Sequence, residues 1–104
     1  MLKSQFSNKG LCMVEKVRYH INFYGDVQGV GFRYTACHAA QMYGCSGWVK
    51  NQYDGSVSME IQGTEGEINM VLEKIKNGRF ISIDRIEKKK TANRDDEWGF
   101  ETKW

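Results

Sequence analysis

The clearest pattern in the chain is an alternation of apolar and polar residues that begins at Val17. From there to Phe23 every second residue is apolar or aromatic, which is the period of a strand buried on one face. Residues 1–16 show no periodicity. We therefore expect a flexible N-terminal leader over residues 1–16 and one folded domain over residues 17–104.

Further changes of period divide the domain into elements. Helical spacing follows the glycine-rich residues 25–31, and an Asp54–Gly55 turn between two β-type runs predicts a hairpin. Thr64 and Glu67 form a capping box at the start of a second helix. The expected elements are a strand at 17–24, a helix at 32–43, strands at 46–51 and 56–62, a helix between 64 and 77, a strand with a bulge at 81–86, and a final strand at 98–104.

This β-α-β-β-α-β order, with a short C-terminal strand added, predicts an α+β fold. Two amphipathic helices on one face of an antiparallel sheet make a ferredoxin-like sandwich. The chain of 104 residues suffices for one such domain. Unrelated activities share this fold, so the order of elements leaves the function open.

Composition and charge are those of an ordinary globular domain. The chain is 40% hydrophobic and 27% charged, with a net charge of +2. It has no apolar run near the roughly 20 residues that a membrane helix needs. Its first sixteen residues also lack the apolar core of a secretory signal. We expect a cytoplasmic protein without nucleic-acid or membrane partners, and take a monomer as the default.

Cysteine and histidine usage gives no sign of a disulfide framework or a metal site. An odd count of three cysteines fits free thiols in a reducing compartment, although a Cys37–Cys45 bridge stays open. Among the cysteines and histidines, Cys37 and His38 are the only adjacent pair. Neighbours on a helix point about 100° apart, so these two cannot grip one ion together. No metal is expected.

The segment Gly25–Arg33, GDVQGVGFR, is the first with a chemical signal. Its glycines allow a tight turn that aims several backbone N–H groups at one point. The helix that follows adds unpaired N–H donors, and the Arg33 guanidinium matches phosphate oxygens in pairs. The segment predicts a cradle for an anion of about phosphate size. Taken alone the signal is weak, because a plain strand-to-helix turn uses glycines too.

A second segment, Gly47–Gly55 with the sequence GWVKNQYDG, places Asn51 at the end of a strand, just before the hairpin turn. An amide side chain both donates and accepts hydrogen bonds, so it can hold a water molecule. Taken alone, an asparagine beside a turn is more often structural, through an Asx-type bond to its own backbone.

Together, GDVQGVGFR and GWVKNQYDGSV resemble the paired signature of the acylphosphatase family, at that family's usual separation of one helix. The likeness is strongest from Val17 to Gln62 and weakens toward Thr102. It does not cover residues 1–16. Two motifs of this length in the right order are far more specific than a single glycine pattern.

The resemblance implies a hydrolase without cofactor or metal that cleaves the carboxyl-phosphate bond of a small acyl phosphate into a carboxylate and inorganic phosphate. It implies that Arg33 holds the phosphate and that Asn51 orients the attacking water. The physiological acyl phosphate does not follow from it. The phosphate-binding residues that it implies are Val27, Gln28, Gly29, Val30, Gly31, Phe32 and Arg33.

Two alternatives stay open. An acylphosphatase-like module also occurs in a larger hydrogenase-maturation carbamoyltransferase, so a carbamoyl-phosphate-handling or phosphate-binding module of the same fold is the first. The second is a single-stranded RNA-binding domain with the same element order. It is disfavoured because the third strand, SVSMEIQ at 56–62, lacks the aromatic residues that such domains display.

The remaining aromatic and histidine side chains are expected to be structural. His20 and His38 are assigned surface or packing roles. Trp48 and Tyr53 are expected to be wall and core residues. The Trp98–Trp104 stripe is expected to cover the edge of the sandwich.

Overall fold

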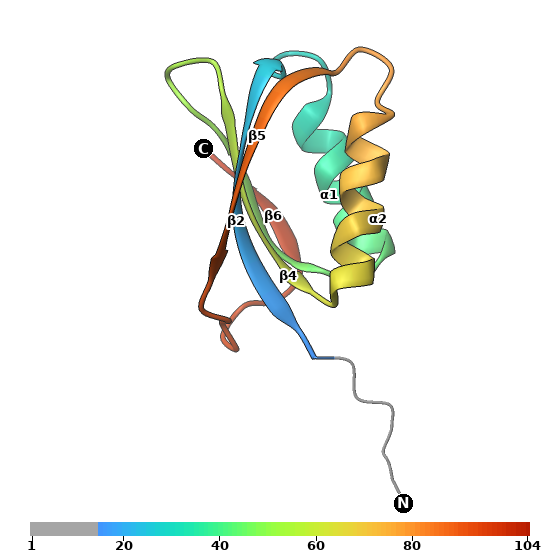
Figure 1. Ribbon diagram of the computed structural model, residues 1–104, viewed down its shortest axis with the longest axis vertical. Helices are drawn as coiled ribbons and strands as arrows, with labels where there is room; N and C mark the ends of the chain where they lie inside the picture. Colours follow the sequence, from blue (N-terminus) through green and yellow to red (C-terminus); the bar gives the residue numbers. More distant parts are fainter. Residues whose placement is uncertain (1–14) are drawn as a thin grey trace, which may run out of the picture.

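The structure is a computed structural model that describes residues 15–104. Most of the expected leader lies outside this range. Both helices cover one face of a five-stranded sheet (Figure 1). Within the described residues, no helix is long and apolar enough to cross a membrane. The elements are β2 (Val17–Asp26), α1 (Phe32–Met42), β3 (Ser46–Asn51), β4 (Val57–Gly63), α2 (Glu65–Lys76), β5 (Ser82–Thr91) and β6 (Phe100–Lys103).

The predicted α+β ferredoxin-like fold is confirmed, with strand order β5-β2-β4-β3-β6. β2 pairs antiparallel with β4 and β5, and β4 pairs antiparallel with β3. The outermost pair, β3 and β6, is parallel, so the sheet is mixed rather than wholly antiparallel. In Figure 1, the loop after β5 passes below the lower end of the sheet and leads into β6, which pairs with β3 at the edge of the sheet opposite β5.

Two local predictions of the sequence are also confirmed. The expected bulge in β5 lies at Asp84, because Tyr24 pairs with Arg85 and the next residue, Gly25, pairs with Ile83. At the start of α2, Glu67 N–H donates to the Thr64 hydroxyl at 3.2 Å and Thr64 N–H donates to the Glu67 carboxylate at 2.9 Å. The apolar stripe of α2 is buried against the sheet, through Ile68, Val71, Leu72 and Ile75.

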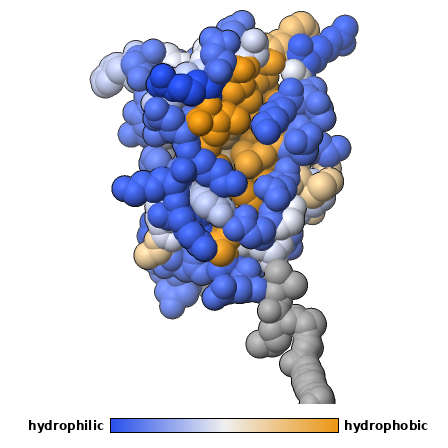
Figure 2. Space-filling model, viewed as in Figure 1, coloured by the Kyte–Doolittle hydropathy of each residue, from blue (hydrophilic) through white to orange (hydrophobic). Residues whose placement is uncertain are grey.

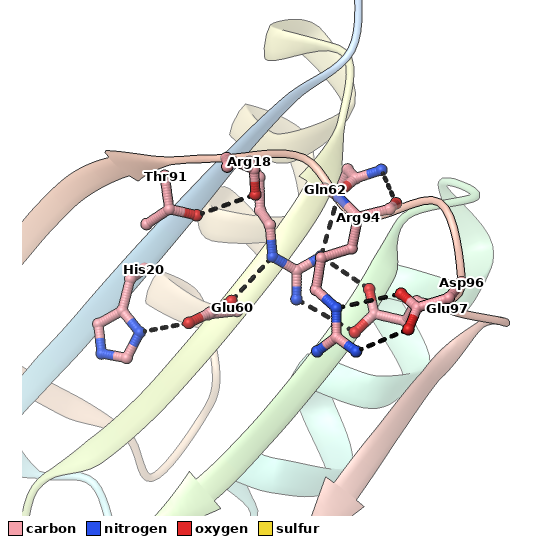
Figure 3. Close-up of polar contacts among 9 residues, drawn as sticks. Arg18, His20, Glu60, Gln62, Thr91, Arg94, Asp96 and Glu97 are labelled. Atoms are coloured by element: carbon pink, nitrogen blue, oxygen red, sulfur yellow. Dashed lines mark hydrogen bonds and ion pairs between the residues drawn. The ribbon is translucent and has the colours of Figure 1, made fainter.

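A buried arginine lies on the sheet face that the helices leave open (Figure 3). Arg18 is fully buried, and it donates hydrogen bonds to Glu60 at 2.8 Å and to both oxygens of Glu97 at 2.8 and 3.1 Å. Burial lowers the pKa of Arg18, but the bonds to Glu97 and Glu60 outweigh this and raise it. The cluster ties the loop before β6 to the middle of the sheet.

β5 forms the edge of the sheet opposite β6, and its Lys88, Lys89 and Lys90 are exposed. Lysines on an edge strand discourage pairing with another chain. An apolar strip runs along the groove between β5 and α2 (Figure 2). A cavity of about 370 Å³ lies there, lined by Lys76, Ile83, Asp84, Arg85 and Ile86.

Three aromatic residues lie elsewhere than predicted. Trp98 and Trp104 are 94% and 90% exposed and do not cover the sandwich, because β6 is too short to include them. Only Phe100 of that segment is a buried aromatic residue. Tyr53 is fully exposed in the hairpin turn, so it is not a core residue.

The cysteines of the described range are not bridged. Cys37 and Cys45 are both free thiols, which answers the question that the sequence left open. Burial raises the pKa of Cys45 to about 11, so this thiol stays protonated near neutral pH. Cys12 lies outside the described residues.

Candidate active site

The glycine-rich turn and the β3–β4 hairpin lie at the same end of the sheet (Figure 1). Between them is a cavity of about 180 Å³, several times the roughly 30 Å³ that one water occupies in the liquid. The structure thus brings Arg33 and Asn51 to one cavity, although helix α1 separates them in the chain. The cavity is lined by Val27, Gly29, Gly31, Phe32, Arg33, Tyr34 and Asn51.

The backbone of the turn offers hydrogen-bond donors. Gly29 and Gly31 have φ values of +71° and +83°, which side chains rarely tolerate. Gly31 is also the N-cap of α1 and supplies no side-chain cap. Within residues 15–104, no backbone N–H of residues 28–34 donates a hydrogen bond to another protein group. Unpartnered donors at a helix N-terminus form a binding site for an anion.

Arg33 adds a positive charge to these donors. It lies in the first turn of α1, and its guanidinium carbon is 4.6 Å from the centre of the Trp104 ring. No carboxylate in the described part of the chain forms an ion pair with Arg33. Asp26, the nearest carboxylate in sequence, is exposed and does not line the cavity. The Arg33 charge therefore remains available to a bound anion.

Asn51 reaches the cavity from the last position of β3. Its side chain makes no hydrogen bond to any group within residues 15–104, so the Asx-type structural role does not apply. The hairpin turn behind it is held by Ser56, whose N–H and hydroxyl donate to the Asp54 carboxylate at 2.9 and 2.6 Å. The hydroxyl bond and then the N–H bond lower the pKa of Asp54. The Asn51 amide is thus free to bind a water molecule, and the hairpin that carries it is held by hydrogen bonds.

Gln28 holds the turn and the hairpin together. Its side-chain N–H₂ donates to the carbonyl oxygens of Gln52 and Ser56, at 2.7 and 2.8 Å. The side chain therefore points to the hairpin and does not line the cavity, although the sequence placed Gln28 in the cradle. Val30 is likewise absent from the lining, because its side chain packs against the core. Neither side chain lines the cavity, so only the backbone N–H groups of these two residues remain as candidate donors.

Two residues at the site were not expected from the sequence. Tyr34 lines the cavity, is 75% exposed, and stacks on His38 with a ring separation of 5.9 Å. Its position directly after Arg33 in the motif was an available signal. Trp104 contacts Arg33 from the far end of the chain, and no local pattern indicates this contact.

The charge at the site comes from Arg33 and backbone dipoles. The cavity lining contains no carboxylate and no imidazole. No group of three or more His, Cys, Asp or Glu residues suited to a metal ion occurs anywhere in residues 15–104. The donor set is that of an anion site rather than of a cation site.

Comparison with known proteins agrees with the motifs and the fold. The acylphosphatase family profile matches residues 19–102. The acylphosphatase of Clostridium acetobutylicum is 44% identical over 84 residues, which cover 80% of this chain and 92% of the relative. The crystal structure of acylphosphatase from Bacillus subtilis has a TM-score of 0.78 at 32% identity, and covers 85% of this chain and 99% of that one.

A longer protein contains a similar unit. Full-length HypF, crystallised in a phosphate- and nucleotide-bound form, has a TM-score of 0.77 at 29% identity. The match covers 86% of this chain but 12% of HypF. With the family profile matching most of its length, the chain belongs to the acylphosphatase family, the hydrolases that act on acyl phosphates.

Proposed function

We propose that the chain hydrolyses the carboxyl-phosphate bond of acyl phosphates without a metal ion, with Arg33 holding the phosphate and Asn51 orienting the attacking water. One observation carries the proposal: Arg33 and Asn51 line the same cavity, together with residues of the glycine-rich turn. Membership of the family supports the reaction, and the geometry of this cavity supports the residue roles.

Phosphate binding depends on donors that are in place before the substrate arrives. The Arg33 guanidinium and the backbone N–H groups of residues 28–33 bind the terminal phosphate oxygens. These donors have no competing protein partner in the described structure. Charge redistributes over the phosphoryl oxygens during transfer, and pre-aligned donors stabilise it without reorganising.

The leaving group requires no acid catalyst. A carboxylic acid has a pKa near 4, so its carboxylate departs without a proton at neutral pH. A cavity lining without imidazole or carboxylate is sufficient for this reaction. The Asn51 amide oxygen accepts a hydrogen bond from the water, or the amide N–H₂ donates one to the water oxygen, and this holds the water in line with the bond that breaks.

The reaction then proceeds in one displacement. The water oxygen bonds to phosphorus while the bond between phosphorus and the acyl oxygen breaks, and the bonding electrons leave with the carboxylate. A proton of the water passes to a phosphate oxygen. Arg33 and the backbone supply the positive charge, so EDTA is expected to leave turnover unchanged.

The test compares Arg33→Ala and Asn51→Ala, with benzoyl phosphate as substrate and inorganic phosphate as competitive inhibitor. Each variant should lose turnover by about 10²- to 10³-fold while keeping its circular dichroism spectrum. Arg33→Ala should also lose inhibition by phosphate, whereas Asn51→Ala should keep it. Asn69→Ala, at an exposed position of α2, is the control and should match the wild type. Normal saturated turnover in Asn51→Ala, with weakened phosphate inhibition, would contradict the assigned roles.

A second candidate is the carbamoyl-phosphate-handling module that the sequence left open. The likeness to HypF, crystallised in a phosphate-bound form, supports a phosphate-binding unit of this fold within a longer protein. Carbamoyl phosphate is also a mixed anhydride of a carboxyl-type group and phosphate, so the same donors would hold it. The ratio of kcat/KM for carbamoyl phosphate to that for benzoyl phosphate decides between them. A higher value for carbamoyl phosphate would favour the second candidate.

The proposal includes the cytoplasm as compartment and a monomer as working form. Support for the compartment comes from Cys37 and Cys45, two unbridged cysteines of the kind found in proteins of reducing compartments. Size-exclusion chromatography of the active enzyme should show a single chain. Activity that depends on protein concentration would contradict the monomer.

A further inference from the structure

Tyr34 is one of the residues that line the cavity at the glycine-rich turn, and it is 75% exposed. We propose that its ring is the platform for the acyl group of the substrate, and that the enzyme therefore favours flat, apolar acyl groups over small aliphatic ones. The inference deepens the proposed function and rests on it, because it names the substrate class of the same site.

The geometry of the displacement decides on which side of the cavity the acyl group lies. In a displacement at phosphorus, the attacking water and the departing carboxylate lie on opposite sides of the phosphoryl group. Asn51, which orients the water, comes from the sheet at the end of β3. Tyr34 comes from the first turn of α1, in the helix layer. The acyl group therefore extends toward the helix layer, where Tyr34 lies.

The Tyr34 ring is held in place for such a contact. It stacks on His38, one helical turn further along α1, with an angle of 14° between the ring planes and 5.9 Å between their centres. One face of the tyrosine ring is thus directed to His38, while the residue as a whole is 75% exposed. A pre-oriented aromatic ring offers a flat apolar surface at low entropic cost.

A neighbouring cavity is the competing location for the acyl group. It measures about 310 Å³ and is lined by Lys50, Asn51, Gln52, Tyr53 and Trp104. Asn51 lines both cavities. In the proposed geometry the water that Asn51 holds therefore borders the second cavity, and an acyl group placed there would leave from the side of the water rather than opposite it.

The experiment measures kcat/KM for benzoyl phosphate and for acetyl phosphate and takes their ratio in each variant. The intrinsic difference in reactivity between the two compounds cancels when the ratios of variants are compared. Tyr34→Ala should lower the ratio about fivefold, and Tyr34→Phe should keep it because the ring remains. The inhibition constant of inorganic phosphate, which has no acyl group, should be unchanged in Tyr34→Ala.

Tyr53→Ala is the matched control, since it removes an exposed tyrosine from the competing cavity. It should leave the ratio unchanged. A fall of the ratio in Tyr53→Ala, or an unchanged ratio in Tyr34→Ala, overturns the inference while leaving the proposed function intact. A wild-type protein that hydrolyses neither compound would instead overturn the proposed function.

Discussion

The guanidinium carbon of Arg33 lies 4.6 Å from the centre of the Trp104 ring. The proposed phosphate-binding residue is thus held by the side chain of the residue that directly follows β6. A cation above an aromatic face is attracted by the negative charge of that face. The contact restricts the Arg33 side chain without neutralising its charge. Trp104 is therefore a positioning residue for Arg33.

Replacing Trp104 should weaken phosphate binding. A cation–π contact at an exposed site is worth about 0.5–1 kcal/mol, so Trp104→Ala should raise the inhibition constant of inorganic phosphate about threefold. Trp104→Phe should lie between this variant and the wild type. Trp98→Ala removes an equally exposed tryptophan that does not contact Arg33, and should have no effect. Equal effects of the two alanine variants would contradict the positioning role.

Gln28 should matter for activity although its side chain does not line the cavity. Gln28→Ala removes two hydrogen bonds between the turn and the hairpin, each worth about 1 kcal/mol, and should lower kcat/KM about tenfold. Gln28→Glu should be worse, because an ionised carboxylate cannot donate to the Gln52 and Ser56 carbonyls and also repels phosphate. Steady-state kinetics gives the order, and a glutamate variant better than the alanine variant would contradict it.

Arg18 should be required for stability. Arg18→Met leaves the carboxylates of Glu60 and Glu97 without their cation, and should lower the free energy of unfolding by about 3 kcal/mol in urea denaturation. Adding Glu97→Gln should restore part of this loss. Arg94→Ala, which removes only an exposed pair with Asp96, should leave the free energy of unfolding nearly unchanged. If adding Glu97→Gln restored none of the free energy of unfolding, an uncompensated charge would not be the cause of the loss in Arg18→Met.

The same cluster should make stability depend on acid pH. Burial alone raises the pKa of Glu60, but the hydrogen bonds from His20 and Arg18 outweigh it and lower the pKa below the ordinary value of 4.5. A lowered pKa means that folding favours the ionised form. This contribution is complete above the unfolded pKa and is lost as the pH falls through the folded pKa.

Glu60→Gln removes that titration. The difference in unfolding free energy between wild type and Glu60→Gln should be largest near neutral pH and should shrink between about pH 5 and 3. Urea denaturation at a series of pH values measures it. A difference that stays constant over this range would show that Glu60 is not the group responsible.

Several features of the fold and site follow from residues close together in the chain. Gly29 and Gly31 make the turn because only glycine readily adopts their backbone angles, and Thr64 with Glu67 starts a helix through bonds that span three residues. The motifs that contain Arg33 and Asn51 indicate both residues as candidates from the sequence alone. That both line one cavity agrees with this prediction, whereas their roles remain to be tested by substitution.

The sequence by itself thus determined the order of elements and the turn, because these depend on backbone angles and on hydrophobic periods over a few residues. The resemblance of its two motifs to the acylphosphatase signature supplied the two candidate residues. Only the tertiary structure decided that Arg18 is buried between two carboxylates, that Gln28 binds the hairpin, and that Trp104 contacts Arg33. Each of these depends on sheet register and on the path of a loop. No local pattern encodes these contacts, since the partners are separated by tens of residues and meet only when the strands pair.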